Sequence, residues 1–441
     1  MLKRHGWNAT SFQILEEGFR YWFDDDACVA YLDTGSAWVV AGTPVAAPAR
    51  IGDVATRFSA TAKLRGKRVC FFATEGRFST APFAAMQIGE QPVWDPRGWD
   101  ETVRRTPSLR EQLRRARAKN VRVRMVSASE IVDPSLPTRA SIEALIVRWL
   151  QSRSMAPMGF LVDVQPFSFA AERKYFVAEH AGRIVGFLAS VPVYARKGWF
   201  LEDLVRDASA PNGTSETLVD AALRQAAEEG SEYVTLGLAP MAGATGWLRA
   251  VKQSTSALYD FRGVHAFKAK LRPDTWEPIY LAYPSVSGGN RALYDSLAAF
   301  ARGRFARFGM QTLLRGPAIV VRILAALLVP WTMLVALADG PHYFPWWWIK
   351  WGWVLFDSAL VVALFALAVR WRRFLGVLVA AAVTADSALT LVQVALYNFP
   401  RAQSALDALV IVIACLSPTF AALTLWGAVA RATRTGAPKH C

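Results

Sequence analysis

Asn212, Gly213 and Thr214 stand directly before an apolar pattern with helical spacing, so we expect them to form the start of a helix. The first N–H groups of a helix have no partner within it, and the helix dipole is positive at this end. Such a start can hold an anion or the carbonyl oxygen of a substrate. An ordinary turn in which Asn212 or Thr214 is the N-cap explains the same residue types, and this alternative stays open.

A second candidate lies in the most basic stretch, residues 104–124, which contains nine Arg or Lys and one Glu. Residues 108–119 are predicted to be helical, with Ser108 as the N-cap. Arg114 and Arg115 on this helix would contact the phosphates of a nucleic acid or of lipid headgroups. A solvated Arg-rich face is the other interpretation. It is weakened because nine cations beside one acid should repel one another unless an anion is near.

The elements that must position these groups form an α/β pattern. Residues 199–205 and 233–238 are predicted strands, and residues 215–229 between them form a helix that ends at Gly230. A hairpin turning at Ala181 and Gly182 is predicted to precede them. The remaining predicted elements are strands over residues 27–32, 37–40, 69–73, 84–88, 175–179 and 183–191, helices over residues 51–64 and 142–150, and a linker over residues 132–137.

The composition of the chain narrows the range of partners that it could bind. The chain has 53% hydrophobic residues, 17 Trp and a net charge of +15, a hydrophobic fraction that is high for a purely soluble protein. Residues 1–317 hold 41 Lys or Arg against 31 Asp or Glu, and residues 318–441 hold 9 against 4. A basic body beside a membrane has two anionic neighbours, nucleic acid and lipid headgroups, and charge alone does not choose between them.

Metal, cofactor and Ser/His chemistry find no support in the pattern of residues. The five histidines have no ligand-like spacing, and the four cysteines form no CxxC pair, so no metal or cofactor is predicted and a reducing cytosol is expected. Residues 209–214 contain a single Gly, which argues against a pyrophosphate-binding loop for coenzyme A. The N-terminus MLKRHGWNAT has no apolar run behind its basic residues, so we expect no signal peptide.

Several motifs occur in one order over residues 6–283: EDLVR, APNGT and LGLAP, then LYDFRGVHAFKAK at residues 258–270 and WEPIYLAYP at residues 276–284. They resemble the aminoacyl-tRNA-dependent lipid aminoacyltransferases, the family of phosphatidylglycerol lysyltransferase, also called lysylphosphatidylglycerol synthase. The resemblance implies two tandem GNAT-like (acyl-CoA N-acyltransferase-like) domains of the α/β class. We expect the first at residues 1–130 and the second, catalytic one at residues 131–290.

The resemblance also implies site residues. The Asp and Arg of the family's DLMR-like motif fall on Asp203 and Arg206, and the lysines of its FKxK motif fall on Lys268 and Lys270. Asp203 would be a general base or an orienting carboxylate, and the cations would contact lipid phosphate or the tRNA terminus. A structural ion pair between Asp203 and Arg206 is the alternative. Tyr259 would line the cleft or be a core aromatic.

Glu202 precedes Asp203 in the predicted strand. Because side chains alternate along a strand, we expect Glu202 to face the opposite side, so that only one of the two carboxylates lines the cleft.

A basic linker, residues 291–317, is predicted to lead into a four-helix transmembrane domain, residues 318–441. Its apolar segments cover residues 318–338, 348–369, 374–397 and 405–430, each about the 20 residues that a bilayer requires. Asp357 and Asp386 lie near the middle of their segments, where a carboxylate is costly. They would pair with each other, meet a cation or line a polar path.

Lys and Arg in the connecting loops orient the segments. Arg370, Arg372 and Arg373, and the basic C-terminal tail, are expected on the side of the body. By the positive-inside rule, the body and the C-terminus are predicted to be cytosolic in a bacterial inner membrane.

These expectations combine into a membrane enzyme that transfers an aminoacyl group from aminoacyl-tRNA to the hydroxyl of a lipid such as phosphatidylglycerol. A cationic amino acid on the lipid would lower the negative surface charge, which bears on resistance to cationic peptides. Two alternatives stay open: a membrane-anchored acyltransferase that uses an acyl thioester, and a non-catalytic module that binds lipid or nucleic acid.

Overall fold

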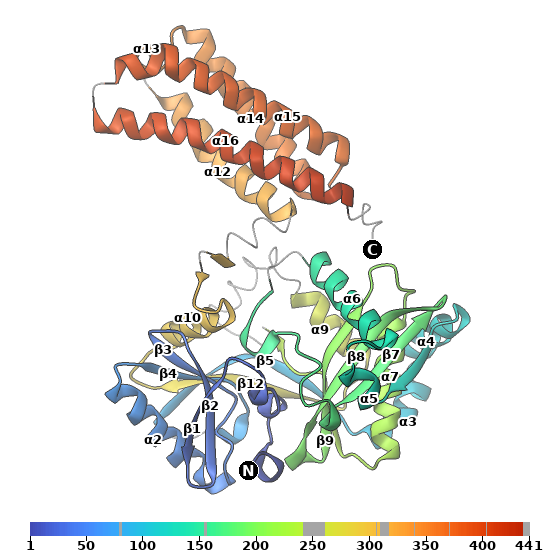
Figure 1. Ribbon diagram of the computed structural model, residues 1–441. Helices are drawn as coiled ribbons and strands as arrows, with labels where there is room; N and C mark the ends of the chain where they lie inside the picture. The colour runs from blue at the N-terminus through green and yellow to red at the C-terminus, as the bar shows by residue number, and fades with distance from the viewer. Residues whose placement is uncertain are drawn as a thin grey trace. The chain divides into compact units, whose positions relative to one another are not determined.

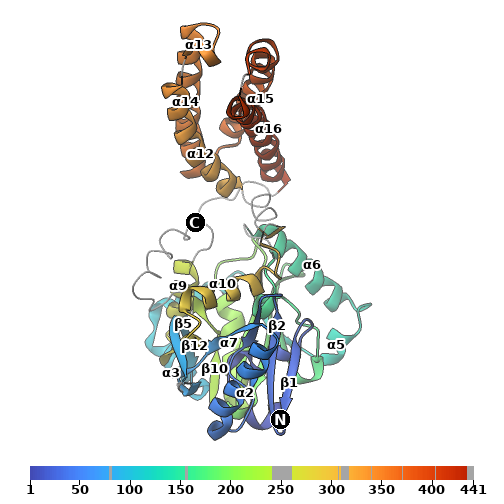
Figure 2. The same ribbon diagram turned by 90° about the vertical axis from the view of Figure 1, so that its left-hand side faces the viewer.

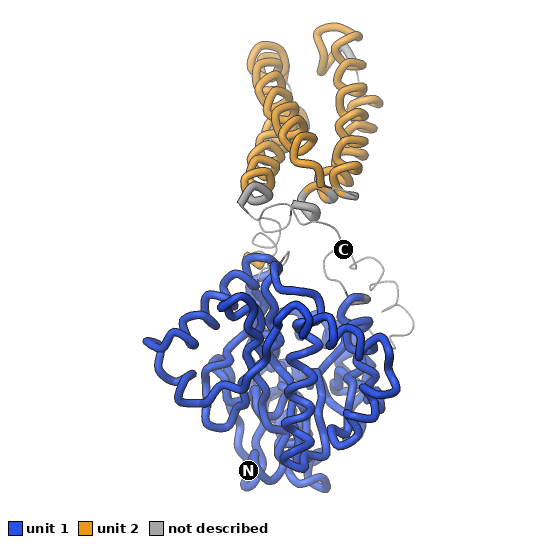
Figure 3. Tube along the Cα trace, turned by 90° about the vertical axis from the view of Figure 1, so that its right-hand side faces the viewer, with its two compact units in different colours: residues 1–152, 157–305 blue, residues 153–156, 306–441 orange. Residues whose placement is uncertain are grey.

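A computed structural model describes residues 1–78, 82–153, 157–240, 261–305, 307–308, 317–338, 340–369, 371–402 and 404–434. The chain forms two compact units (Figure 3). Unit 1 comprises residues 1–152 and 157–305, and unit 2 comprises residues 153–156 and 306–441.

Unit 1 is built on one mixed sheet, which has 12 strands in the described residues (Figure 1). Its order is β1-β2-β3-β4-β12-β5-β10-β9-β8-β7-β6, with β11 paired to β5 outside this path. The strands are β1 Arg20–Asp24, β2 Ala27–Asp33, β3 Ala37–Ala41, β4 Arg68–Thr74, β5 Phe83–Trp94, β6 Arg122–Val126, β7 Lys174–His180, β8 Arg183–Val193, β9 Gly198–Arg206, β10 Tyr233–Thr235, β11 Ala239–Pro240 and β12 Thr275–Pro284.

Helices cover both faces of this sheet. Near β3 and β4, α2 (Ile51–Leu64) packs on one face and α10 (Gly289–Phe300) on the other (Figure 2). Near β7, β8 and β9, α7 (Thr214–Glu228) packs on one face and α6 (Pro137–Ser152) on the other. The other α-helices in the described part of unit 1 are α1 Leu2–His5, α3 Trp99–Arg105, α4 Pro107–Ala118, α5 Ala128–Val132 and α9 Phe261–Lys270.

The long strand β5 joins the two halves of the sheet. It pairs antiparallel with β12 along ten residues and with β10 through Val93 and Trp94. β12 comes from the far end of unit 1 in sequence, yet it lies between β4 and β5. The two predicted α/β domains therefore share one sheet, and the end of the second completes the strands of the first. A division at residue 130 stays a prediction.

Most predicted elements of unit 1 are present. The two hairpins, β2–β3 and β7–β8, and helices α2, α4 and α6 occur where alternation and helical periodicity indicate them. β10 ends at Thr235 rather than at residue 238, and β6 lies inside the basic stretch, where no strand was predicted. The alternation in β6 covers only the five residues RVRMV and directly follows a run of arginines, so it does not stand out as a pattern.

Unit 2 consists of helices. They are α12 Pro317–Leu337, α13 Gly340–Tyr343, α14 Trp347–Val369, α15 Arg373–Gln393 and α16 Ala405–Arg434, with a π-helical turn at Val394–Asn398 and a 3₁₀ turn at Phe399–Arg401. Three stretches of the described chain are long and apolar enough to cross a membrane: Trp347–Ala368, Arg373–Arg401 and Asp407–Ala430. The fourth predicted segment is helical, but the apolar part of its described residues is shorter, Ile323–Leu337.

Candidate functional site

Strand β9 places two neighbouring carboxylates on one face of the sheet. Asp203 pairs with Ala189 and Leu201 pairs with Ser190, so Glu202 is an extra residue that forms a β-bulge. Leu201 and Leu204 consequently both pack in the apolar cluster beneath α7. Glu202 and Asp203 lie between them in sequence and face the opposite side, that of α6. The expectation that strand alternation would separate these two residues was wrong, because the bulge interrupts the alternation.

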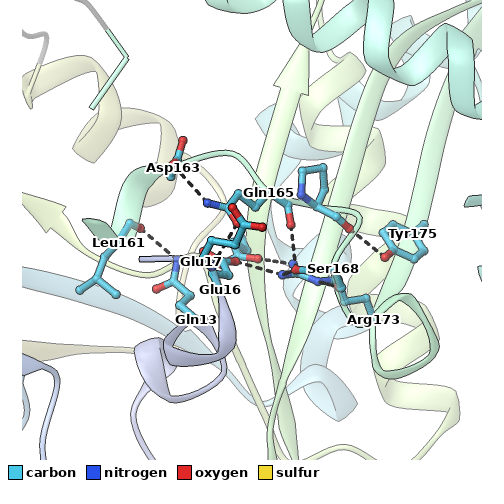
Figure 4. Close-up of polar contacts among 11 residues, drawn as sticks. Gln13, Glu16, Glu17, Leu161, Asp163, Gln165, Ser168, Arg173 and Tyr175 are labelled. Carbon is cyan, nitrogen blue, oxygen red and sulfur yellow. Dashed lines mark hydrogen bonds and ion pairs between the residues drawn. The ribbon is translucent and has the colours of Figure 1, made fainter. Parts of the chain in front are cut away.

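Arg173 organises the charges on this face. Its guanidinium is fully buried and forms ion pairs with Glu202 at 2.5 Å and with Glu16 at 3.0 Å. Its Nε also donates to the carbonyl of Ser168 at 2.8 Å. Figure 4 shows the guanidinium between Ser168 and Glu16. One guanidinium is thus held by groups from the N-terminal segment, the loop before β7, and β9.

The segment before Arg173 ties the N-terminal residues to this cluster (Figure 4). Gln13 donates to the carbonyl of Leu161 at 3.0 Å, and the Gln165 amide donates to Asp163 at 3.2 Å. Phe160 and Phe169, near the two ends of the segment, have left-handed backbone conformations with φ of 61° and 50°. Such conformations are costly for a bulky residue and persist where the surroundings enforce them. The packing around the cluster therefore holds these two residues in conformations that they would not adopt by themselves.

This buried cluster contains more carboxyl groups than cations, and the pKa values of the carboxyl groups are raised. Burial, and then the Glu202 carboxylate, raise the pKa of Glu16 to about 8. Burial raises the pKa of Glu202, while the Arg173 guanidinium opposes that rise. The pKa of Asp203 is held well above its usual range by burial and by Glu202. A proton shared among these carboxyl groups near neutral pH is the physical consequence.

Asp203, like Glu202, has a carboxylate oxygen without a hydrogen-bond partner among the described residues, but unlike Glu202 it forms no ion pair with them. It is 8% exposed, and its Oδ2 has no hydrogen-bond partner among the described residues. A buried carboxylate oxygen without a donor is costly and indicates a group that acts on something else. With a raised pKa, Asp203 can take a proton from an acceptor and return it.

Arg206 faces away from Asp203. Regular pairing continues from Asp203 to Arg206, so Arg206 lies on the face of Leu204, under α7. It forms no hydrogen bond or ion pair with the other described residues. The structural ion pair between Asp203 and Arg206 is therefore not formed, and the described residues do not bring the two together in one cleft.

Lys270 is the last residue of α9, and its side chain reaches the start of α7. Its amine forms an ion pair of 2.8 Å with Glu216 in the first turn of that helix. Gly186, the strand partner of Arg206, would meet the side chains of Thr214 and Leu218 if it carried a Cβ. Arg206 and Lys270 thus both lie near the beginning of α7, on the opposite face of the sheet from Asp203.

Lys268 is buried and its donors are fully used. Its ammonium donates to the carbonyls of Leu236, Gly237 and Leu238 at 2.8, 2.8 and 2.9 Å. These carbonyls follow β10, where the chain leaves the sheet. Burial lowers the pKa of Lys268 to about 7, although three carbonyl acceptors favour the charged form. Because an ammonium has three N–H groups, this geometry indicates a positioning residue.

The loop before α7 has a different cap from the one expected. Gly213, with φ of 94°, is the N-cap, and its side-chain-free Cα packs against the carbonyl of Gln112 in α4. Thr214 donates to the carbonyl of Pro211 at 2.7 Å, and Asn212 is exposed. A side chain at Gly213 would push α4 and α7 apart. The N-cap position is therefore taken by this glycine and not by Asn212 or Thr214. Tyr259 lies outside the described residues.

Arg110, Arg114 and Arg117 of α4 line an open groove of about 610 Å³ together with Arg224 of α7, whereas Arg115 does not line it. Arg114 and Arg115, which are 70% and 66% exposed, both pair with Glu111. The repulsion inferred from sequence was overstated, because carboxylates from elsewhere approach the stretch. Arg104 and Arg105 pair with Glu101, Arg117 with Asp220, and Arg124 with Glu130 and Glu179.

Arg173, Glu16 and Asp163 were not anticipated from the sequence. They lie far apart in the chain, in segments without periodicity or a motif, so no local signal marks them. Among the described residues, no group of three or more His, Cys, Asp or Glu is arranged to hold a metal ion.

Known proteins resemble this chain in sequence. The sequence model of the family "Phosphatidylglycerol lysyltransferase, C-terminal" matches residues 1–283. The chain is 23% identical over 283 residues to a lysylphosphatidylglycerol biosynthesis bifunctional protein, LysX, of Gordonia bronchialis, covering 59% of this chain. It is 32% identical over 112 residues to a phosphatidylglycerol lysyltransferase of Bacillus subtilis, covering 23% of this chain.

Solved structures share the fold. The C-terminal domain of a putative lysylphosphatidylglycerol synthetase from Agrobacterium fabrum has a TM-score of 0.56 and 23% identity, covering 67% of this chain and 93% of that chain. L-PGS from Bacillus licheniformis has a TM-score of 0.57 and 19% identity, covering 68% of this chain and 94% of that chain.

The matches cover only parts of the two curated relatives, 24% of the Gordonia protein and 13% of the Bacillus subtilis protein. The family profile nevertheless accounts for most of unit 1, including β9 and the whole of the buried carboxylate cluster. This chain belongs to the phosphatidylglycerol lysyltransferase C-terminal family.

Proposed function

We propose that the chain transfers an aminoacyl group from aminoacyl-tRNA to the hydroxyl of a membrane lipid such as phosphatidylglycerol. The proposal rests on the observation that the family match and the geometry of the site point to the same strand. The family match spans β9, and Asp203 on that strand is a buried carboxyl group with a raised pKa and an oxygen without a donor among the described residues.

The reaction requires little chemistry from the protein, because the ester of an aminoacyl-tRNA is already activated. The lipid hydroxyl oxygen attacks the carbonyl carbon, and the bond from that carbon to the ribose oxygen of the tRNA breaks. The hydroxyl proton passes to the ionised carboxylate of Asp203 and then to the leaving ribose oxygen. Glu202 and Arg173 act as positioning residues that set the orientation and the pKa of Asp203.

Cations elsewhere on unit 1 supply contacts for anions. Arg206 and Lys270, near the first turn of α7, would hold a phosphate, together with the N–H groups of Asn212 and Gly213. The N–H of Thr214 already donates to the carbonyl of Pro211 at 3.3 Å. The α4 groove, with Arg114 beside it and Arg115 on the same helix, would contact the backbone of the tRNA acceptor arm. Lys268 would keep the end of β10 in place rather than touch substrate.

Unit 2 would hold the enzyme at its lipid substrate. Three helices can cross a bilayer, and α12 would be the fourth crossing. The loop arginines near the start of α15 favour a cytosolic position for unit 1, where charged tRNA is present. Two GNAT-like domains, divided near residue 130, remain part of this proposal.

The test is to express the chain in a bacterial host that lacks aminoacylated lipids and to analyse its lipid extract by mass spectrometry. We expect a new lipid whose mass equals phosphatidylglycerol plus an aminoacyl group. D203N should abolish it, whereas D53N, a matched change at a carboxylate that is 62% exposed on α2, should not. A wild-type extract without such a lipid, from cells that contain the folded chain, would refute the proposal.

A further inference from the structure

Unit 2 contains an open cavity of about 680 Å³ whose wall is mostly apolar. This volume is typical of sites that bind small molecules. Leu, Val, Ile, Trp and Phe side chains of α12, α14, α15 and α16 make up most of the lining. Two carboxylates, Asp357 of α14 and Asp386 of α15, also line it, and no Lys, Arg or His does among the described residues. The cavity therefore combines an apolar wall with negative charge that its own lining does not neutralise.

Asp357 is the residue that points to a ligand. It is 5% exposed and forms no hydrogen bond or ion pair with the other described residues. Asp386 receives one hydrogen bond, from Thr390 at 3.3 Å. Asp407, by contrast, accepts from Tyr343 at 3.1 Å and lies 3.0 Å from the ring nitrogen of His342. Asp407, outside the cavity, thus has partners. Asp357 and Asp386, inside it, have no cation beside them among the described residues.

Two amide side chains of the lining are already engaged. Gln393 accepts from the indole N–H of Trp353 at 2.9 Å, and Asn398 donates to the carbonyl of Tyr343 at 2.8 Å. A π-helical turn, Val394–Asn398, presents this part of α15 to the cavity, and such turns occur frequently at functional sites. Asp357 and Asp386 therefore remain as groups of the wall that can accept hydrogen bonds and positive charge.

Pro418 adds one more acceptor. It lies inside α16 and has no N–H, so the carbonyl of Ala414 lacks the donor that a regular helix would supply. Both residues line the cavity. Trp331 and Trp353 in the same wall offer aromatic faces, which also attract cations. The two carboxylates, this carbonyl and the aromatic faces all favour a cationic ligand group.

We propose that this cavity binds a membrane lipid whose headgroup carries a protonated primary amine. The ammonium lies beside Asp357 and Asp386, where its three N–H groups meet carboxylate and carbonyl oxygens, and an acyl chain follows the apolar wall. Two sources share this chemistry: an aminoacylated phosphatidylglycerol, which is the product proposed above, and phosphatidylethanolamine.

The experiment uses the full chain in non-ionic detergent micelles and native mass spectrometry to count bound lipids. The probes have identical acyl chains: alanyl-phosphatidylglycerol, its N-acetylated form, phosphatidylethanolamine and phosphatidylglycerol. A charge-assisted contact favours the free-amine lipids by at least about tenfold over the N-acetylated form and over phosphatidylglycerol. A stronger signal for alanyl-phosphatidylglycerol than for phosphatidylethanolamine assigns the site to the product, and the reverse assigns it to the common lipid.

Variants locate the site. D357N and D386N keep the side-chain shapes and remove the charges, so the double variant should lose the preference and each single variant should reduce it. S358A, at an exposed position on the same helix outside the lining, should keep it. The melting temperature of each variant checks its folding.

Retention of the N-acetylated lipid as strongly as the free amine, or an unchanged preference in folded D357N, would overturn the inference. Binding is measured with added lipid, so its outcome does not depend on transferase activity. D203N should keep the amine preference while making no product, which separates failure of this site from failure of the proposed function.

Discussion

At the scale of single residues, the proposed chemistry depends on how burial sets the charge of Asp203. Its carboxyl group lies beside Glu202, and Glu202 is paired to the buried guanidinium of Arg173. A neighbouring negative charge in a buried site disfavours ionisation, so Glu202 tunes Asp203 without touching the substrate.

This tuning predicts a pH dependence of aminoacyl transfer. The pKa of Asp203 is raised, so activity should increase with pH as Asp203 loses its proton. E202Q removes the negative neighbour and lowers the pKa of Asp203, so the rising limb should move to lower pH. D203N should reduce the rate by roughly 10²–10⁴-fold at all pH values. Initial rates of lipid aminoacylation across pH measure both effects.

An unchanged limb in E202Q would mean that Asp203 does not set the profile. D53N is the control, because it removes a carboxylate that is exposed on α2 and should leave the profile as in the wild type.

Lys268 gives a second prediction at this scale, on stability. K268M leaves the carbonyls of Leu236, Gly237 and Leu238 buried without their donor, which should cost roughly 2–4 kcal/mol in the free energy of unfolding. K270M removes a partly exposed ion pair and should cost less than about 1 kcal/mol. Chemical denaturation of the two variants compares them.

An inactive K268M protein with unchanged stability would instead assign Lys268 to substrate contact. Both lysines occur in the FKAK motif, so the motif alone does not distinguish the buried positioning residue from the partly exposed one.

At the scale of elements, α4 and α7 share the groove that we assign to tRNA. Arg110, Arg114 and Arg117 of α4 and Arg224 of α7 line it, and Glu111 is the acidic residue of the lining. Carboxylates that pair with some of these arginines hold their side chains in place but leave an excess of positive charge. Phosphate contacts of this kind add affinity and salt dependence without sequence selectivity.

The groove predicts the outcome of a double substitution. R110A/R114A should weaken tRNA binding and reduce the slope of log affinity against log salt by roughly one unit for each phosphate group that the variant no longer binds. K63A, which removes a positive charge from an exposed position on α2, should change neither. Filter binding or fluorescence anisotropy over a range of salt concentrations measures the slope. Equal effects of the two changes would indicate that only net charge matters.

At the scale of the whole molecule, the continuous sheet makes unit 1 cooperative. β12 lies between β4 and β5, so the strands of the first half depend on residues 275–284. Leu281 of β12 is fully buried in the core of that half. A change in the last strand should therefore be detected in strands that precede it by about two hundred residues.

L281A tests this coupling. Loss of a buried leucine side chain should destabilise unit 1 by about 2–5 kcal/mol and speed hydrogen exchange in β4 and β5. L64A, at a leucine that is 91% exposed on α2, should change stability by less than about 0.5 kcal/mol. Hydrogen exchange of the full chain in detergent, read by mass spectrometry, follows each strand. Unaltered exchange in β4 and β5 would contradict a single cooperative sheet.

The sequence by itself determined the local elements and the family. Periodicity marks α2, α4 and α7 because a helix that covers a sheet must repeat its apolar residues every three to four positions. Alternation around short turns marks the two hairpins for the equivalent reason in strands. Length and hydropathy predicted four apolar segments, because a bilayer sets a minimum apolar length, and three helices of the described residues are long and apolar enough to cross a membrane.

Only the tertiary structure decided which side chains meet. Arg173, Glu16 and Glu202 come from three segments, and a bulge at Glu202 reverses the alternation that the sequence predicts. Lys268 and Lys270 are two residues apart on a helix, so one turns inward to carbonyls and the other outward to Glu216. Such contacts depend on register, bulges and long-range packing, and none of these has a local pattern in sequence.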